Sequence, residues 1–299
     1  MISKILRLRS VFLGVVVLSV FSFGCGSPEG SGDDDIAEQI DSTKGNLLTV
    51  NGEIFSIPSP IQTAMLIKKS GANYNKEMLN TSSKSSSYST SFKKALNLGV
   101  YGADLGYVTI YEQTQDALSY MGTAKKIADD LGVSGAFDGQ TIDRFQKNLG
   151  SKDSLLSLVS VAYRASDAYL KNNDRNEISG LILTGGWIES LNFATNVFKM
   201  KGDAEVKRRI AEQKLSLNSL IKLLTPYYSQ PEYAELIDAL KEVSAVFDAV
   251  EFKYVYEKPT VDVEKKTTTV NSKTEAVITD EQVKNISEKI QSIRNQIVG

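Results

Sequence analysis

Tyr101-Gly102-Ala103-Asp104-Leu105-Gly106-Tyr107 stands in the middle of a long helical pattern in this chain of 299 residues. Around it, apolar or small residues follow one helix face at intervals of three and four, and they occupy positions 96, 99, 100, 103, 107, 110, 114, 117, 118 and 121. Such spacing is typical of a helix that buries one side. The stretch therefore predicts a helical body and places a carboxyl group, that of Asp104, on a largely apolar face.

Capping residues and apolar spacing predict further helices along most of the chain. Ser59 followed by Pro60 marks the start of the first of them, and the Ser- and Thr-rich segment 81–91 is expected to be a loop. The helices expected after the central pattern cover residues 151–169, 176–200, 203–225 and 231–250. Residues 47–57 are expected to form one strand or an extended lead-in.

The C-terminal part of the chain changes pattern twice. Residues 252–278 alternate and are rich in Val, Thr and Tyr, which predicts a β-hairpin or a small meander. Thr279 and Gln282 then have the spacing of a capping box. The helix that follows has apolar positions at 283, 286, 290, 293 and 297. Two heptads favour packing on the body over a long coiled coil.

These patterns predict a mainly α protein, namely a bundle of antiparallel helical hairpins with a small C-terminal β-hairpin and a final amphipathic helix. The phrase Tyr101-x-Ala103-x-x-Gly106-Tyr107 returns once, as Tyr163-x-Ala165-x-x-Ala168-Tyr169. The interval between them matches no standard repeat length and there is no third copy, so a bundle is favoured over a repeat solenoid.

The residue counts exclude several classes of protein. The chain has no histidine, which removes Ser-His-Asp and Cys-His catalysis, His-ligated zinc and proximal-His haem. A single cysteine removes disulfides within the chain and thiolate metal clusters. The 34 basic and 36 acidic residues lack the surplus of positive charge that nucleic-acid binding needs. We therefore expect no cofactor, no metal site and no nucleic-acid partner.

The N-terminal segment carries the most specific signal. Lys4, Arg7 and Arg9 precede an apolar run of 14 residues, Val11–Gly24. As a helix this run would be ~21 Å long, which is short of the ~30 Å hydrocarbon core of a bilayer. It therefore predicts a signal peptide rather than a transmembrane helix. The run ends at Cys25, after which Gly, Ser and Asp dominate.

Ser22-Phe23-Gly24-Cys25 resembles the lipobox of bacterial lipoproteins, in which the cysteine thiol is diacylglycerol-modified and cleavage makes that cysteine the first residue. The resemblance implies a lipid anchor on Cys25 and a place in the cell envelope, facing the periplasm or the cell surface, with the outer membrane favoured. Cleavage would leave 31 basic and 36 acidic residues, a net charge of −5. Asp33-Asp34-Asp35 is expected to belong to a solvated tether, with a surface-export tag as the alternative.

The body also resembles helical bacterial lipoproteins of unassigned function. Phe55-Ser56-Ile57-Pro58-Ser59-Pro60, Tyr101–Tyr107 and Gly185-Gly186-Trp187-Ile188-Glu189-Ser190-Leu191 carry this resemblance, which implies no particular activity. The expected units are a cleaved signal peptide at 1–24, a flexible acidic tether at 25–45, a helical domain at 46–252, the β-hairpin at 253–278 and the C-terminal helix at 279–299.

Polar groups on otherwise apolar helix faces form the candidate ligand site. Two adjacent glycines, Gly185 and Gly186, cost a helix about 1–2 kcal/mol relative to two alanines, so close helix approach or a bound ligand must offset that cost. One hypothesis is a pocket where helices over 99–113, 155–171 and 178–199 meet. Its lining residues would be Asp104, Tyr107, Arg164, Asp167, Trp187 and Glu189. The favoured alternative is close helix packing in which the buried charges pair.

Two functions fit these observations. The first is a lipid-anchored, non-catalytic binding or assembly module whose partner is an envelope protein or a small polar ligand such as a sugar or peptide. The alternative is a carboxylate-dependent hydrolase of envelope glycans or peptides, tested at Asp104, Asp167 and Glu189. A hydrolase needs carboxyl groups that converge in a cleft, whereas a binding module exposes an apolar patch. No catalytic residue is assigned.

Replacing Cys25 with Ala removes the thiol that lipidation requires. We expect Cys25→Ala to abolish incorporation of labelled palmitate, measured on the protein isolated from cells grown with that label. Unchanged labelling of the variant would contradict the lipid anchor.

Overall fold

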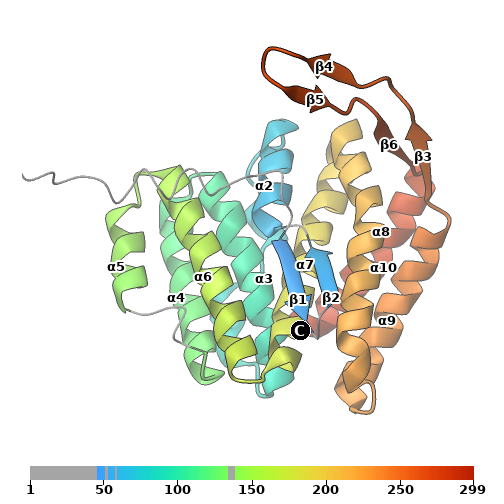
Figure 1. The fold of residues 1–299 in the computed structure, drawn as a ribbon. Helices are drawn as coiled ribbons and strands as arrows, with labels where there is room; N and C mark the ends of the chain where they lie inside the picture. Colours follow the sequence, from blue (N-terminus) through green and yellow to red (C-terminus); the bar gives the residue numbers. More distant parts are fainter. Residues whose placement is uncertain (1–45, 51–52, 58, 134–138) are drawn as a thin grey trace, which may run out of the picture.

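A computed structural model describes residues 46–50, 53–57, 59–133 and 139–299, which form a helical bundle (Figure 1). Two helices, α3 (Ser91–Ile110) and α7 (Asn176–Lys201), are buried on nearly every side. Burial of α3 is unbroken from Ala95 to Ile110, and in α7 it extends from Ile178 to Thr195 with one partly exposed residue. A helix without a polar face belongs in a protein interior. These two helices therefore form the centre of the bundle.

The other helices surround this central pair. In Figure 1, α4, α5 and α6 lie to one side, and α8, α9 and α10 lie to the other. Their bounds, with those of the short 3-10 turns, are α2 Pro60–Lys69, η1 Lys76–Met78, η2 Ser82–Ser86, α4 Thr114–Asp130, α5 Gly139–Lys147, α6 Lys152–Asn172, α8 Ala204–Leu224, η4 Thr225–Tyr227, α9 Pro231–Asp248 and α10 Asp280–Val298. Helices consecutive in the chain, such as α3 with α4 and α8 with α9, pack together. The predicted mainly α class is confirmed.

Side-chain caps explain where the helices begin. At each of five starts a side-chain oxygen accepts a hydrogen bond from a backbone N–H of the first turn, which typically stabilises a helix by ~1 kcal/mol. These caps are Ser59, Thr90, Ser151, Asp203 and Thr279. The expected capping box is present at α10, where the Gln282 side chain also accepts from the Thr279 backbone N–H at 2.7 Å.

The apolar spacing of one helix face is divided between two helices. The apolar spacing between residues 96 and 121 is continuous, but α3 ends at Ile110 and α4 begins at Thr114. Glu112 adopts a left-handed backbone conformation with φ of 59°, and the backbone N–H of Gln113 donates to the carbonyl of Val108 at 2.9 Å. This hydrogen bond closes the end of α3 and reverses the chain. The turn contains neither Gly nor Pro, so its residue types do not reveal it.

The strands of the described residues form three two-stranded antiparallel sheets. Residues 47–57, expected to be one strand or a lead-in, belong to a hairpin of β1 (Asn46–Val50) and β2 (Glu53–Ile57). The predicted C-terminal hairpin is present. Its base pairs β3 (Glu251–Val255) with β6 (Lys273–Val277), and its tip pairs β4 (Thr260–Asp262) with β5 (Thr267–Thr269). It projects beyond the helix ends at one end of the bundle (Figure 1).

Two glycines let the backbones of α3 and α7 touch. A Cβ atom built on Gly99 would lie 1.9 Å from the carbonyl oxygen of Ile182, and one built on Gly185 would lie 1.9 Å from that of Leu96. No side chain fits at such distances, since non-bonded carbon atoms pack at roughly 3.5–4.0 Å. Close helix packing therefore accounts for Gly185 in the middle of a helix.

We expect Gly185→Ala to lower the free energy of unfolding by about 3 kcal/mol or more, because the added methyl group meets backbone atoms and the helices must separate. Gly122→Ala is the matched control in α4, where a Cβ would meet nothing within 4 Å. That change is expected to stabilise the protein by about 0.5–1 kcal/mol.

Urea unfolding measures both changes through the fluorescence of Trp187, the only tryptophan. Equal midpoints for Gly185→Ala and the wild type would contradict the backbone contact.

Candidate functional site

Two of the predicted site residues meet inside the core. Asp104 of α3 and Glu189 of α7 are both fully buried, and their carboxyl groups lie close enough for each to influence the pKa of the other. Asp104 lies five residues beyond Gly99, and Glu189 lies four beyond Gly185, so the close approach at the glycines also brings the acids together. Two ionised carboxylates facing each other out of water would repel strongly. The pair needs a positive charge, a proton or both.

Arg294 of α10 supplies the positive charge. Its Nη2 donates to Glu189 Oε1 at 2.7 Å, and its Nε donates to Oε2 of the same carboxylate. Nη2 also donates to the backbone carbonyl of Met78 at 3.0 Å. A two-pronged guanidinium–carboxylate pair is among the strongest side-chain interactions when water is excluded. Glu189 is therefore the ionised partner of Arg294, and this single cation faces two carboxyl groups.

Asp104 has an oxygen that lacks a hydrogen-bond donor. Its Oδ2 accepts from the backbone N–H of Asn80 at 3.2 Å, whereas Oδ1 is buried without a partner among the described residues. Burial raises the pKa of Asp104 well above its usual range, and the adjacent Glu189 raises it further, while Arg294 offsets part of the effect. The Asp104 carboxyl therefore combines an oxygen without a hydrogen-bond partner with a strongly raised pKa.

Buried amides and phenols surround the carboxyl pair. The Asn80 side chain donates to the Tyr88 hydroxyl at 2.9 Å and to Oδ1 of Asn97 at 3.2 Å. The Tyr120 hydroxyl donates to the Asn80 carbonyl at 2.9 Å. Buried polar groups are costly when unpaired and rigidifying when paired. This network fixes the segment around Asn80 against α3 and α4.

The same region binds the last turn of α10. The final carbonyls of a helix have no partner within the helix. The Asn97 amide donates to the Ile297 carbonyl at 2.9 Å, and the Lys84 ammonium donates to the Val298 carbonyl at 3.0 Å. Together with the Arg294–Glu189 pair, these contacts connect the C-terminal helix to the centre of the bundle.

Tyr107 and Trp187, also predicted as site residues, pack in separate contacts. The Tyr107 hydroxyl accepts from the backbone N–H of Asn75 at 3.0 Å, and its ring centroid lies 4.9 Å from that of Phe193. Trp187 is 3% exposed, and its indole N–H donates to the side chain of Gln213 on α8 at 3.0 Å. Both aromatic side chains therefore have their hydrogen-bond partners within the protein.

Arg164 and Asp167, the remaining predicted residues, lie in α6, and their side chains are outside the described part of the structure. Of the six residues proposed to line one pocket, the structure thus places Asp104 and Glu189 in direct contact and gives Tyr107 and Trp187 other partners.

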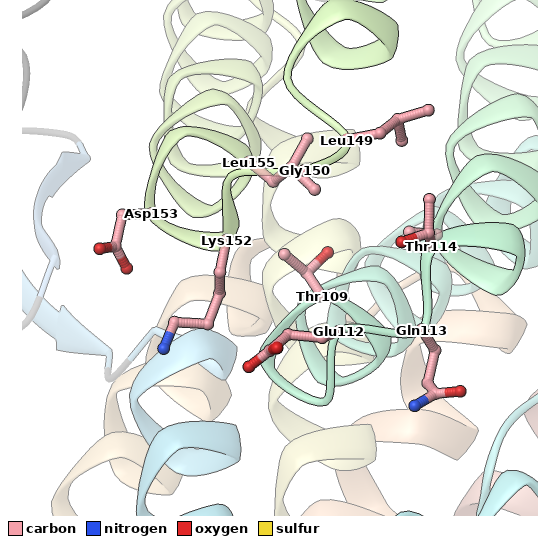
Figure 2. A pocket seen from close by; sticks show the side chains of 10 residues that line it. Thr109, Glu112, Gln113, Thr114, Leu149, Gly150, Lys152, Asp153 and Leu155 are labelled. Atoms are coloured by element: carbon pink, nitrogen blue, oxygen red, sulfur yellow. The ribbon is translucent and has the colours of Figure 1, made fainter.

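A surface pocket of about 410 Å³ is lined by none of these six residues (Figure 2). Its lining residues, none of them predicted, are Thr109, Glu112, Gln113, Thr114, Ala117, Leu149, Gly150, Lys152, Asp153 and Leu155. Figure 2 shows the leucines on one side and the charged ends of Glu112 and Lys152 on the other. Glu112 is already paired with Lys68 at 2.9 Å. The pocket thus offers mixed charges at its rim and no buried charged group to select a ligand.

Large exposed apolar side chains gather on the C-terminal hairpin. Among the described residues there are eleven such side chains, and seven of them lie between β3 and β6. We call these seven the hairpin patch: Phe252, Tyr254, Tyr256, Val261, Val263, Val270 and Val277. Tyr254 and Tyr256 are each 68% exposed and Val263 is 81% exposed. Scattered single exposures are ordinary, whereas several on one hairpin make that hairpin a candidate interaction surface.

Neither a metal-ligand group nor a known relative points to a function. Within the described ranges, no three Cys, Asp or Glu side chains are grouped as metal ligands, and no helix combines the length and apolar character needed to cross a bilayer. No protein-family model, curated protein or solved structure matches the chain. The geometry of the described residues is therefore the basis for a functional proposal.

Arg294 is the site residue that sequence reasoning misses. The apolar positions 290, 293 and 297 define the buried side of the last helix, and Arg294 lies one turn after position 290 on that same side. A lone arginine within an apolar stripe is the available signal, because a cation in such a position requires a buried anion.

Glu189→Gln leaves the Arg294 guanidinium buried without its anion. We expect this change to lower the free energy of unfolding by about 3–5 kcal/mol, as measured by urea unfolding at neutral pH. Glu242→Gln is the control, because Glu242 also pairs with α10, through Lys289 at 2.9 Å, but is 71% exposed. The control is expected to unfold close to the wild type. An equal loss of unfolding free energy in both variants would show that burial of the Arg294–Glu189 pair adds nothing to its contribution to stability.

Proposed function

We propose that this chain is a lipid-anchored cell-envelope protein that acts as a non-catalytic binding or assembly module, and that the hairpin patch is its contact surface for a protein partner. The observation that carries the proposal is the concentration of exposed Tyr and Val side chains on a hairpin that projects from the bundle (Figure 1).

The chemistry of the hairpin favours a protein as the partner. Residues 251–277 contain five lysines and five acidic residues, so their charges balance and give no attraction to a polyanion or an anionic surface. Tyrosine is enriched in protein interfaces, since its ring buries a large apolar area while its hydroxyl still hydrogen-bonds. A two-stranded hairpin is also marginally stable by itself in water, so added contacts from a partner would stabilise it.

The hydrolase alternative has less support. Acid–base hydrolysis needs two carboxyl groups that flank a bond of the substrate. Asp104 and Glu189 do converge, but both are fully buried and Glu189 is occupied by Arg294. A substrate bond has no access to them in this conformation. The geometry therefore favours the binding module.

The lipid anchor rests on the sequence. Cys25 and the tether at 25–45 lie outside the described residues, and the resemblance of residues 22–25 to a lipobox supports acylation. Outer-membrane attachment, facing the periplasm or the cell surface, is part of the same proposal. Confining a protein to a membrane raises its effective concentration toward partners in that membrane, which suits a surface of modest size.

Photo-crosslinking in intact cells tests the hairpin patch. A photo-reactive phenylalanine analogue replaces Tyr254 in one strain and Tyr228, an exposed tyrosine away from the hairpin, in the control strain. We expect a reproducible adduct with one envelope protein from position 254 and none from position 228. The adduct should disappear when Val263→Lys is added, because a charge then replaces an apolar contact.

Two results would contradict the assignment of the patch. One is the absence of any adduct from position 254 while the protein is present at its normal level. The other is the same adduct from positions 254 and 228, which would place the contact outside the hairpin.

A further inference from the structure

We propose that Asp104 and Glu189 hold one proton between them in the folded protein, and that this shared proton makes the stability of the core depend on pH. In the proposed arrangement Asp104 is a neutral acid whose O–H donates to the Glu189 carboxylate, and Arg294 neutralises Glu189 from the other side. The proposal concerns the stability of the core and is independent of the proposed partner of the hairpin.

The count of charges at the pair leads to this arrangement. Both carboxyl groups are fully buried, and within the described part of the chain the only cation paired with either is Arg294. Two carboxylates and one guanidinium would leave a net negative charge away from water, which is far costlier than a neutral acid. One proton taken from solvent removes this charge. The only bond formed is the O–H bond on Asp104.

The unpaired oxygen indicates where the proton resides. Oδ2 of Asp104 already accepts from the Asn80 backbone, whereas Oδ1 lacks a donor and is buried. A proton on Oδ1 turns this orphaned acceptor into a donor toward Glu189. The one unsatisfied buried side-chain atom among the described residues is then satisfied, as buried polar groups nearly always are.

The other titratable groups near the pair do not provide a competing charge. They are all phenols: Tyr101 on α3, Tyr120 on α4, and Tyr74 and Tyr88 from the segments before α3. Burial raises the pKa of Tyr101 and Tyr120, and their hydroxyls donate to backbone carbonyls. Tyr101 and Tyr120 therefore stay neutral, and Asp104 is the carboxyl group of this cluster that exchanges its proton.

The sign of the pH dependence follows from linkage. An aspartic acid in an unfolded chain has a pKa of about 3.9, and the pKa of buried Asp104 is higher. Folding therefore takes up a proton between these two pKa values. The stabilisation is complete below the unfolded pKa and is lost as pH rises through the folded pKa.

The composition of the chain makes this effect visible. With no histidine, no side chain of ordinary pKa other than the thiol of Cys25 titrates between about pH 5 and pH 9. The α-amino group also titrates in this window, so the loss of stability that identifies the perturbed carboxyl is the part that depends on Asp104. Asp116 provides a contrast, because hydrogen bonds from Lys76 and Tyr74 lower its pKa, so its stabilisation is lost only on acidification.

The test compares the wild type, Asp104→Asn and Asp116→Asn as full chains in urea, with Trp187 fluorescence as the readout at several pH values. In the wild type the folding equilibrium constant should fall by up to about tenfold per pH unit within the window, because one proton is lost. The amide of Asp104→Asn mimics the neutral acid and should remove this dependence, whereas Asp116→Asn should retain it.

A pH slope in Asp104→Asn equal to that of the wild type would overturn the proposal. Infrared spectroscopy of the wild type at pH 7 gives an independent measurement, which holds even if Asp104→Asn fails to fold. We expect the carbonyl band of a protonated carboxylic acid, since every ordinary carboxyl group is ionised at that pH. Absence of this band would also overturn the proposal.

Discussion

The backbone contact between α3 and α7 is the constraint on which the rest of the structure depends. Gly99 and Gly185 bring the two helices together until carbonyl oxygens occupy the space where side chains would start. Little more than one turn further along, the same approach leaves Asp104 and Glu189 fully buried against each other. Buried acids need a cation, and Arg294 provides it only when α10 is docked. Close packing at two glycines thus determines where the last helix must lie.

Much of the fold was predictable because its signals are local. Caps and apolar spacing depend on residues within a few positions of one another, so the helix starts at Ser151, Asp203 and Thr279 followed from the sequence. The turn at Tyr111–Gln113 has no such local signal, since its left-handed residue is a glutamate and the apolar spacing continues across it. There the tertiary contacts of α3 and α4 decide the backbone conformation.

The candidate site was predictable only in part, for a different reason. Asp104 and Glu189 were identifiable as acids on apolar helix faces, and Gly185 beside them as a point of close approach. Which charges would pair was a question of long-range geometry, because Arg294 lies 105 residues from Glu189 in the chain. Arg164, the arginine predicted among the site residues, lies in α6 as expected, and its side chain is outside the described part of the structure. Periodicity identifies the buried face of a helix but not the residue that it meets.

The buried ion pair also fixes the register of α10, which the apolar side of this helix cannot do. Ile286, Ile290, Ile293 and Ile297 repeat at helical intervals, so a shift of α10 by one turn would again place isoleucine against the bundle. Apolar contacts therefore stabilise docking without fixing its register. The Arg294–Glu189 pair has a single acceptable position, because any shift leaves both charges buried and unpaired. Since β6 of the hairpin precedes α10 by only a few residues, the register of α10 also fixes where the hairpin patch is presented.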